Sequence, residues 1–426
     1  MVTPSVKKVA FAAFIGTTIE WYDFYIYALA SVLIFGPLFF PSDNQFITIL
    51  GTFGTFAIGF LARPLGAIIF GHIGDRLGRK KSLIMTLMLM GMATTCVGLL
   101  PTFETAGIIA PILLVLLRIM QGIAVGGEWG GAVLMAGEHA PKGLKNFFSS
   151  FAQWGSPAGN VLALLVFSYI LSLPEALLFD SNYWRLPFLV SFILLIIGLV
   201  ARITLTESPV FVEASKKQQQ IKQQESAPLV SVFKHSLPII ILAIGANALS
   251  FSGIFSNTLM IGYTTLALQV DKNIILEALF WVAIVHFICQ PFTAYLAEKI
   301  QASYFLILSA LFAMLSVFLL FPIVNMGNKT SFIIGISLTV ICYSGFYGVI
   351  AGYLSRVFPV RIRYTALSIS YQGCAALFGS IIPLVGGYII YQYGTFWYPL
   401  ALFYCVLALI SIICIYLLSR YHYYDE

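Results

Sequence analysis

Long apolar stretches are the feature that most constrains this chain. A helix needs about 20 mostly apolar residues to cross a bilayer, and such stretches follow one another along nearly the whole sequence. The first set covers 9–36, 46–71, 82–100, 107–137, 146–173 and 185–204. The second set covers 235–263, 273–297, 304–323, 331–355, 364–392 and 395–419. The pattern predicts an all-α membrane protein with twelve transmembrane helices in two six-helix bundles.

The composition agrees with a membrane protein. Hydrophobic residues make up 60% of the chain and charged residues only 9%, whereas a soluble domain has about 25% charged residues. One long polar interval, "TESPVFVEASKKQQQIKQQESAPLVS", separates the two sets. We therefore expect an N-terminal bundle over 1–204, a cytoplasmic linker with a short surface helix over 205–233, and a C-terminal bundle over 234–426.

The distribution of Lys and Arg predicts the orientation, because cytoplasmic loops carry an excess of these residues. If the N-terminus lies inside, only Arg185, Lys272 and Lys329 fall near the outer surface. We expect both termini to be cytoplasmic and the protein to reside in the plasma membrane, which is the inner membrane in a Gram-negative source. The net charge of +6 then reflects topology, and no nucleic-acid partner is expected.

Several functional classes lack their sequence signatures. The six cysteines lie in apolar segments without metal-ligand spacing, so we expect no disulfide framework, metal or cofactor. The sequence has no Ser/His/Asp arrangement, HExxH or Walker A motif, which argues against an enzyme and an ATP-driven pump. A channel needs a continuous polar pore, and the apolar stretches offer none. A receptor that does not transport is the remaining alternative from another class.

An internal repeat supports two related halves. The segment "GHIGDRLGRKKS" after the second stretch aligns with "AYLAEKIQASYF" after the eighth, with Glu298 in the place of Asp75. The segment "APKGLKNFFSSFAQWG" after the fourth stretch aligns with "FPVRIRYTALSISYQG" after the tenth, and the two offsets are 223 and 218 residues. Many secondary transporters are built from such repeats, with the substrate site near the midplane between them.

One loop and several segments resemble a known family. The loop signature G-x-x-x-D-R-x-G-R-[RK] of the major facilitator superfamily matches Gly71, Asp75, Arg76, Gly78, Arg79 and Lys80. The segments "EWYDFY", "RIMQGIAVGGEWGGA", "LTESP" and "FPVRIRY" resemble the metabolite:proton symporter family of that superfamily. The likeness covers nearly the whole chain and implies a major facilitator fold and a monomeric, proton-coupled carrier of a small-molecule substrate in the lipid bilayer.

The loop of the first half predicts a cytoplasmic gate. Asp75 is expected to face the positive N-terminus of the helix that starts near Arg363, and Arg79 is expected to pair with Glu138. The predicted gating residues are Gly71, Asp75, Arg76, Gly78, Arg79 and Glu138. The alternative is that the basic residues only set the orientation. The second copy, "AEKIQAS", lacks the glycines and terminal arginines, so we do not expect it to gate as the first copy does.

Two carboxylates interrupt the first apolar stretch. At about 1.5 Å per residue from Val9, Glu20 lies roughly 17 Å and Asp23 roughly 21 Å into a core of about 30 Å. Arg118 lies about 17 Å from the outer end of the fourth stretch, at the same level. Charges at this depth pair or line a wet cavity, so we predict an Asp23–Arg118 pair with Glu20 as a second partner.

This trio is the predicted proton-coupling site. Burial disfavours an ionised carboxylate and a nearby arginine favours it, so the charge of such an acid can change as access alternates. The resemblance points the same way, since sugar-porter relatives are similar in using an acid and an arginine on the same two helices. The alternatives are a permanent ion pair that fixes helix packing, and coupling to sodium.

Polar and aromatic residues at similar depth are the predicted substrate contacts, with packing or lipid contact as the alternative role for the aromatic ones. They are Gln153, Trp154, Asn247, Tyr343, Tyr347, Tyr371 and Gln372. His286 is expected to be a packed core histidine, and Glu128 lies among small residues that favour close helix packing.

The substrate class follows from the arginines. A di- or tricarboxylate needs more than one cationic partner. Apart from Arg185 and Arg202 at the two ends of the sixth stretch, the apolar stretches hold only Arg63, near the inner edge, and the already paired Arg118. Three tyrosines and Trp154 offer an aromatic setting for an ammonium group. We therefore favour a zwitterion such as proline or betaine, with a carboxylate of the oxoglutarate, citrate or shikimate type as the alternative.

Overall fold

The computed structural model describes residues 4–42, 45–141, 143–171, 173, 182–208, 210–213, 236–360 and 362–421. The secondary-structure elements of these residues are all helical. The first half contains α1 (Pro4–Leu33), α2 (Phe35–Phe39), α3 (Gln45–Leu77), α4 (Arg79–Leu99), α5 (Phe103–Ala106), α6 (Ile109–Glu138), α7 (Lys145–Leu171), the 3-10 turn η1 (Tyr183–Arg185) and α9 (Leu186–Ile203). Each apolar stretch predicted in this half therefore contains a helix.

The second half begins with a broken helix. It runs through α12 (Leu237–Ala246), η2 (Ala248–Phe251), α13 (Ser252–Ile254), η3 (Phe255–Leu259), α14 (Met260–Gly262) and η4 (Tyr263–Ala267). The remaining elements are α15 (Lys272–Leu296), η5 (Ala297–Lys299), α16 (Ala302–Val324), α17 (Lys329–Ser355), α18 (Arg363–Tyr393) and α19 (Tyr398–Leu418).

The break in the seventh stretch differs from the continuous helix that the sequence predicts. The axis bends by 41° between Leu237–Ala246 and Ala248–Ala267. At the bend, the Asn247 side chain donates to the carbonyl of Ala243 at 3.0 Å, and the backbone N–H of Leu249 donates to the Ser411 hydroxyl at 2.9 Å. The Ser411 hydroxyl also donates to the carbonyl of Gly245 at 3.3 Å, so it stands between two backbone groups that would bond to each other in a regular helix. A side chain inserted into the backbone ladder in this way is a usual cause of a kink.

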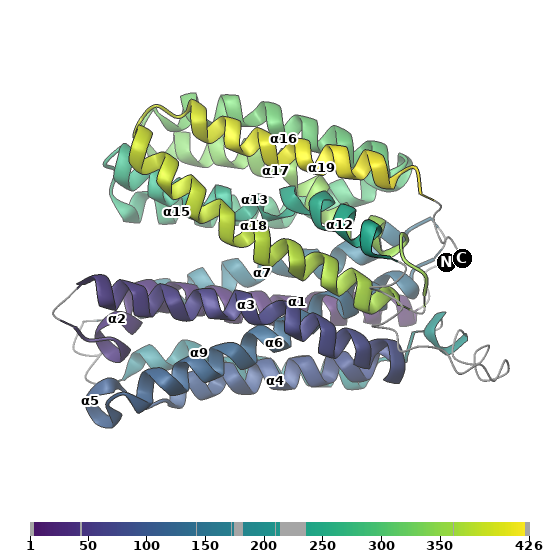
Figure 1. Cartoon of the computed structure of the whole chain (residues 1–426), viewed down its shortest axis with the longest axis horizontal. Coiled ribbons are helices and arrows are strands. Elements are labelled where there is room, and N and C mark those ends of the chain that lie inside the picture. The colour runs from purple at the N-terminus through teal and green to yellow at the C-terminus, as the bar shows by residue number, and fades with distance from the viewer. Residues whose placement is uncertain are drawn as a thin grey trace.

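The helices form two layers that meet along their length (Figure 1). The helices α1 to α9 make up one layer and α12 to α19 the other, and the two chain ends lie at the same end of the molecule. The layers meet where α3 packs on α18 and where α7 packs on α15 and α17. The predicted division into 1–204, 205–233 and 234–426 stays a prediction, since most of 205–233 lies outside the described residues.

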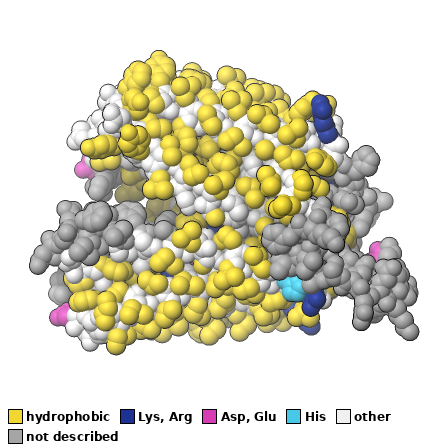
Figure 2. Space-filling model, viewed as in Figure 1, with side chains coloured by type: hydrophobic (Ala, Val, Ile, Leu, Met, Phe, Trp, Pro, Cys, Tyr) yellow, Lys and Arg dark blue, Asp and Glu magenta, His cyan; other side chains and the backbone are white. Residues whose placement is uncertain are grey.

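The outer surface is apolar, as Figure 2 shows for one face. Large exposed apolar side chains lie on most of the long helices; examples are Leu61, Leu99, Ile193, Phe292, Tyr304 and Leu384. Among the described residues, eight helices are long and apolar enough to cross a membrane, and the bent helix of the seventh stretch brings the number to nine. Three further helices, α1, α3 and α7, have 30, 33 and 27 residues. This surface is that of a membrane protein.

Candidate functional site

A hydrogen-bonded cluster joins the two halves at the end of the molecule where both termini lie. Asp75, near the end of α3, accepts hydrogen bonds from the backbone N–H groups of Tyr364 at 3.2 Å and Thr365 at 2.9 Å. The Thr365 hydroxyl donates a third bond at 2.7 Å. These N–H groups belong to the first turn of α18, where they have no partner within the helix. The buried carboxylate therefore caps a helix of the other half.

Arg79, the first residue of α4, connects this cap to further helices. Its fully buried guanidinium pairs with Asp75 at 3.0 Å and with Glu138 of α6 at 3.7 Å. Glu138 also pairs with Arg363 of α18 at 3.7 Å, and its side chain accepts a hydrogen bond from Ser208. The contacts that the sequence predicts for Asp75, Arg79 and Glu138 are therefore present, and their gating role stays a prediction.

The other predicted gating residues differ in what they do. A Cβ on Gly71 would lie 2.8 Å from the backbone of Thr365, so only glycine permits this approach of α3 to α18. Gly78 has a φ of 107°, a left-handed conformation that favours glycine. Arg76 is exposed at the surface. The two glycines shape the cluster, whereas Arg76 lies outside it.

Glu207 completes this cluster, although the sequence analysis did not select it. Its carboxylate accepts hydrogen bonds from the backbone N–H groups of Arg79 at 3.0 Å and Lys80 at 3.2 Å. It thereby caps the N-terminus of α4, a position where negative charge is stabilising. Glu207 belongs to the segment "LTESP", whose family resemblance was the only signal that the sequence offered.

The second half repeats the contact of Asp75, although its loop lacks most of the motif. Glu298 accepts hydrogen bonds from the backbone N–H of Phe147 at 2.7 Å and from the Asn146 side chain at 3.2 Å, both in the first turn of α7. Arg356, just after α17, donates to the side-chain oxygen of Asn146. In both copies, an acid near the C-terminal end of one helix thus caps a helix of the opposite half. The second copy therefore keeps the capping contact without the glycines and terminal arginines of the motif, and the expectation that it does not gate as the first copy does stays a prediction.

The predicted coupling residue Asp23 is buried in the middle of α1. Its carboxylate accepts hydrogen bonds from Thr94 of α4 at 2.9 Å and from Ser191 of α9 at 2.6 Å. The two hydroxyls supply the partners that a buried charge or a buried carboxylic acid requires. Asp23 therefore connects three helices of the first half.

Arg118 reaches Asp23 through two intermediate side chains. Its guanidinium donates to Gln121 at 3.2 Å, and Gln121 donates to the Thr94 hydroxyl at 2.8 Å. The guanidinium also lies 4.0 Å from the centre of the Tyr27 ring. The ion pairs of the described residues do not include Asp23 with Arg118. The direct pair that the sequence predicts is replaced by the chain Asp23, Thr94, Gln121, Arg118, because Gln121 and Thr94 lie between the two charges.

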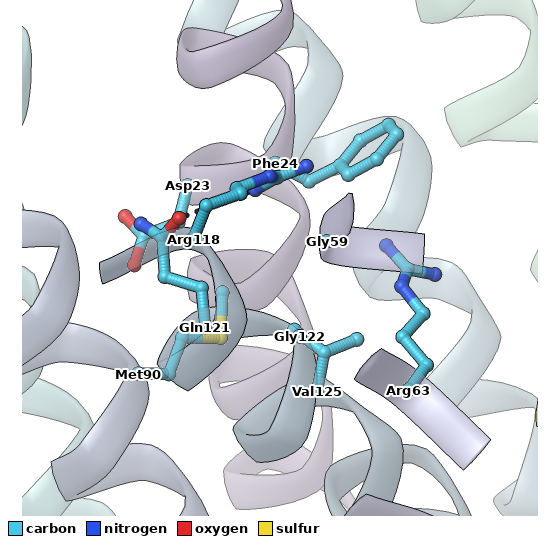
Figure 3. A pocket seen from close by; sticks show the side chains of 9 residues that line it. All are labelled: Asp23, Phe24, Gly59, Arg63, Met90, Arg118, Gln121, Gly122 and Val125. Carbon is cyan, nitrogen blue, oxygen red and sulfur yellow. Dashed lines mark hydrogen bonds between the residues drawn. The ribbon is translucent and has the colours of Figure 1, made fainter. Parts of the chain in front are cut away.

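A small pocket lies at this chain (Figure 3). It is lined by Asp23, Phe24, Gly59, Arg63, Met90, Arg118, Gln121, Gly122 and Val125. Asp23 and Gln121 lie on one side of it, and Arg63 lies on the other. A Cβ on Gly59 would overlap the Arg118 guanidinium, so the glycine leaves room for that side chain. The pocket is about the size of a water site.

Glu20 is placed differently from its prediction as a second partner of Arg118. Its side chain is buried and its Oε2 atom accepts no hydrogen bond within the described structure. The charged groups that interact electrostatically with Glu20 are Glu128, Arg63, Arg202 and Asp23. Glu20 thus faces a different set of charges, one turn of α1 away from the Asp23 chain.

Glu128 and Arg202 form a buried ion pair that the sequence argument did not find. Arg202 near the end of α9 donates two hydrogen bonds to the Glu128 carboxylate, which also accepts one from Thr86 at 2.7 Å. Glu128 lies among the small residues that favour close helix packing, and Arg202 follows it by 74 positions in the chain. A Cβ on Gly16 would overlap the Arg202 guanidinium. The acid in "GGEWGG" was the only available signal, and the sequence did not indicate its partner.

Two of the predicted substrate contacts meet at the interface of the halves. Gln153 of α7 accepts a hydrogen bond from the Trp129 indole at 2.6 Å and donates to the carbonyl of Tyr347 at 3.1 Å. The Trp129 ring stacks on Tyr371 of α18, with centroids 3.7 Å apart. Trp129 therefore joins this group, although the sequence argument had not selected it.

A second group lies next to it in the C-terminal half. The rings of Tyr343 and Tyr347 are 5.5 Å apart, and His286 lies 5.7 and 6.1 Å from them. The Tyr343 hydroxyl donates to the carbonyl of Ser250, whose own hydroxyl contacts Asn247 at 3.4 Å. The predicted residues Tyr343, Tyr347 and Asn247 are therefore connected to the bend of the broken helix.

The last two predicted contacts are arranged differently. The Trp154 indole donates to the carbonyl of Phe287 at 2.7 Å, and its ring packs against Phe14, Phe151 and Phe287. The ring contacts of Trp154 are thus with phenylalanines and not with the three tyrosines. Gln372 is buried and donates to the carbonyl of Val125 at 3.3 Å, while its side-chain oxygen has no partner among the described residues. Gln372 connects α18 to α6.

Comparisons with known proteins agree with this geometry. The family model "Sugar (and other) transporter" matches residues 9–228, and the model "Major Facilitator Superfamily" matches residues 246–424. The chain is 35% identical to an inner membrane metabolite transport protein of Escherichia coli, over 91% of this chain and 89% of that protein.

Two further relatives come from the same organism. The chain is 32% identical to the shikimate transporter, covering 95% of this chain and 92% of that one, and 29% identical to the proline/betaine transporter, covering 96% and 82%. The fold is similar to that of the proton:xylose symporter XylE, with a TM-score of 0.78, 16% identity and coverage of 99% and 96%.

The matched models, the full-length relatives and the shared fold lead to one assignment. The chain belongs to the major facilitator superfamily and is an integral transporter of the plasma membrane rather than an enzyme.

Proposed function

We propose that the protein is a proton-coupled symporter of a small organic metabolite that works by alternating access. The observation that supports it most is the buried chain from Asp23 to Arg118, which puts an acid and an arginine in the middle of membrane-spanning helices. Ionisable residues at this depth are costly and serve transport or proton relay by default. The named functions of the relatives, metabolite, shikimate and proline/betaine transport, support a metabolite as substrate.

The proposed topology has twelve transmembrane helices with both termini cytoplasmic. The three long helices α1, α3 and α7 supplement the nine candidates found by length and composition. Cysteines introduced at Lys272 and Lys329 test the orientation, since both positions are expected outside. Labelling from the cytoplasmic face alone would overturn it. We further propose that the protein acts as a monomer in the lipid bilayer.

Asp23 is the proposed coupling carboxylate, with Arg118 as its charged partner and Glu20 as a neighbouring acid. Thr94 and Gln121 connect Asp23 to Arg118, so the arginine influences the acid through polarised hydrogen bonds. Protonation of Asp23 would change the bonds to Thr94 and Ser191 that join α1 to α4 and α9. A proton would thereby alter the packing of the first half.

The proposed substrate is a zwitterion such as proline or betaine, and a carboxylate metabolite is the second candidate. The cluster of Trp129, Tyr343, Tyr347 and Tyr371 supports an ammonium group, because aromatic faces attract cations. The relatives support both candidates, since one is named for shikimate and another for proline and betaine.

Transport by reconstituted protein tests the proposal. Purified protein in proteoliposomes should accumulate labelled proline or betaine when a pH gradient is imposed without sodium. Accumulation that requires sodium would replace the proton by that ion. Counterflow of labelled substrate separates a carrier from a channel or receptor, and the absence of counterflow for the zwitterions and for oxoglutarate, citrate and shikimate would contradict the proposed function.

A further inference from the structure

Arg63 of α3 is a buried cation for which the described residues supply no hydrogen-bond or ion-pair partner. Its side chain is 6% exposed, and its guanidinium makes no hydrogen bond or ion pair within the part of the chain that the structure describes. Its contacts are with two ring faces, Phe60 at 4.2 Å and Phe24 at 5.3 Å. Ring faces leave the N–H edges of a guanidinium available, and these edges match a carboxylate with two parallel hydrogen bonds.

This state is unusual for the molecule. Each of the other buried arginines in the described chain has a polar partner; these are Arg79, Arg118, Arg202 and Arg363. A buried charge is costly unless it is paired and hydrogen-bonded. Arg63 therefore lacks the partner that the other four already have within the protein, and an anionic ligand would provide it.

A carboxylate lies near Arg63 without contacting it. Glu20 of α1 is also 6% exposed, its Oε2 atom has no hydrogen-bond partner among the described residues, and Arg63 is among the charges that act on it. The two side chains are not within ion-pair distance, since the described ion pairs do not include them. Glu20 lies one turn of α1 before Phe24, whose ring contacts Arg63, so the two charges lie near each other without forming an ion pair.

The second half supplies the opposite wall. Besides Glu20, the groups that interact electrostatically with Arg63 are Tyr347 of α17 and Tyr371 of α18. These are the tyrosines of the aromatic groups described above, and Phe60 of α3 lies against Gly379 of α18. Arg63 and Glu20 therefore face the interface of the two halves, where transporters of this architecture hold their substrates.

We propose that Arg63 and Glu20 are the two poles of a binding site for a zwitterion, with Arg63 holding the carboxylate of the substrate and Glu20 its ammonium group. This assignment rests on the proposed transport function and names the residues that bind the two charges of the proposed zwitterion. A single cation next to an anion suits a ligand with one charge of each sign, and Glu20 repels a second carboxylate. Glu20 then serves the ligand, and Asp23 alone is the coupling acid.

Binding of four probes to the purified full-length protein tests the proposal by calorimetry. The probes are proline, cyclopentanecarboxylate, which lacks the amine, prolinamide, which lacks the carboxylate, and citrate. Wild-type protein should bind proline more tightly than the other three. Arg63→Gln should weaken the binding of proline and of cyclopentanecarboxylate by at least about 30-fold, and the affinity for prolinamide should not change. Glu20→Gln should weaken the binding of proline and of prolinamide, and the affinity for cyclopentanecarboxylate should not change.

Controls separate a lost contact from a damaged fold. Arg420→Gln and Glu277→Gln change exposed charges and should bind proline as the wild type does. Arg63→Lys keeps the charge without the planar fork, so its loss should be smaller than that of Arg63→Gln. The proposal would be overturned if a variant lost affinity equally for all probes, or if Arg63→Gln bound proline as the wild type does. It would also be overturned if the wild-type protein bound citrate best or bound none of the probes.

The proposed binding site and the proposed proton coupling can be rejected independently of each other. Wild-type protein that shows the pattern but does not accumulate proline under a pH gradient would reject proton symport and keep the site. Accumulation of proline that Arg63→Gln leaves unaltered would reject the site and keep symport.

Discussion

Asp75 and Thr365 connect the two halves of the transporter through a single carboxylate oxygen, which accepts the backbone N–H of Thr365 at 2.9 Å and its hydroxyl at 2.7 Å. The acid lies at the end of α3 and the threonine in the first turn of α18. Negative charge at a helix N-terminus is stabilising, and both groups are buried from competing water. The proposed alternating access would require this contact to break whenever the same end opens.

Asp75→Asn should therefore favour the state in which this end is open. The amide keeps one acceptor and loses the charge, and hydrogen bonds to charged groups contribute about 1.5–3 kcal/mol each. The conformational equilibrium should shift by about tenfold or more, and the transport rate should fall. A cysteine at Ser368, one turn deeper in α18 and buried beside Gly130, should react faster with a water-soluble thiol reagent in this variant.

The comparison uses a background without the native cysteines and Glu277→Gln as the control, because Glu277 pairs with Lys329 at the exposed surface. Normal transport per inserted molecule and unaltered labelling in Asp75→Asn would favour the alternative that the loop only sets orientation.

Glu298→Gln should produce the same kind of effect at the symmetry-related contact. Glu298 caps α7 through Phe147 and Asn146, as Asp75 caps α18. The two caps share no residue, so their effects on labelling at Ser368 should be approximately additive in free energy. A double variant that labels no faster than Asp75→Asn alone would show that the second copy does not hold the closed state.

Asp23→Asn should abolish uphill uptake and retain exchange. The amide resembles the protonated acid and cannot release a proton, so the cycle of the loaded carrier continues without coupling. Accumulation driven by a pH gradient and counterflow in proteoliposomes measure the two activities separately.

Thr94→Val is the matched test of the hydrogen-bonded chain, because valine has the shape of threonine without the hydroxyl that contacts both Asp23 and Gln121. It should shift the pH dependence of uptake without abolishing accumulation. Full proton-driven accumulation in Asp23→Asn would assign the coupling to another group.

Periodic and local features of the sequence predict much of this structure. Each long apolar run corresponds to helix, and the capping of α18 by Asp75 follows from the position of an acid at one helix end and of Arg363 at the start of another. Contacts between distant side chains were beyond the same reasoning. The Asp23–Arg118 pair was inferred from equal depth, but depth does not fix the rotation of a helix, and Gln121 and Thr94 occupy the space between the charges.

The sequence did not predict the bend at Asn247 or the burial of Arg63, for the same reason. The bend depends on Ser411, which is far along the chain. Arg63 looked like an edge residue by counting positions, whereas packing of α3 against α1 and α18 encloses it. Partners that lie far apart in the sequence leave no periodic signal, so the aromatic group was predicted with Trp154 where the structure has Trp129.

Removing one member of the Glu128–Arg202 pair should destabilise the fold strongly, whereas replacing both members by apolar residues should change its stability little. Removing one member of a buried ion pair leaves an uncompensated charge and costs about 3–5 kcal/mol, whereas an apolar pair of similar volume is often neutral. Glu128→Leu or Arg202→Met alone should thus lower the thermal unfolding midpoint of the purified protein strongly, and the double variant should recover most of the loss. The exposed pair of Glu277 and Lys329 is the control, since removing either partner there should cost at most about 1 kcal/mol. Single variants as stable as the wild type would show that water reaches the site, and a stable double variant that has lost transport would give the pair a role in the cycle beyond packing.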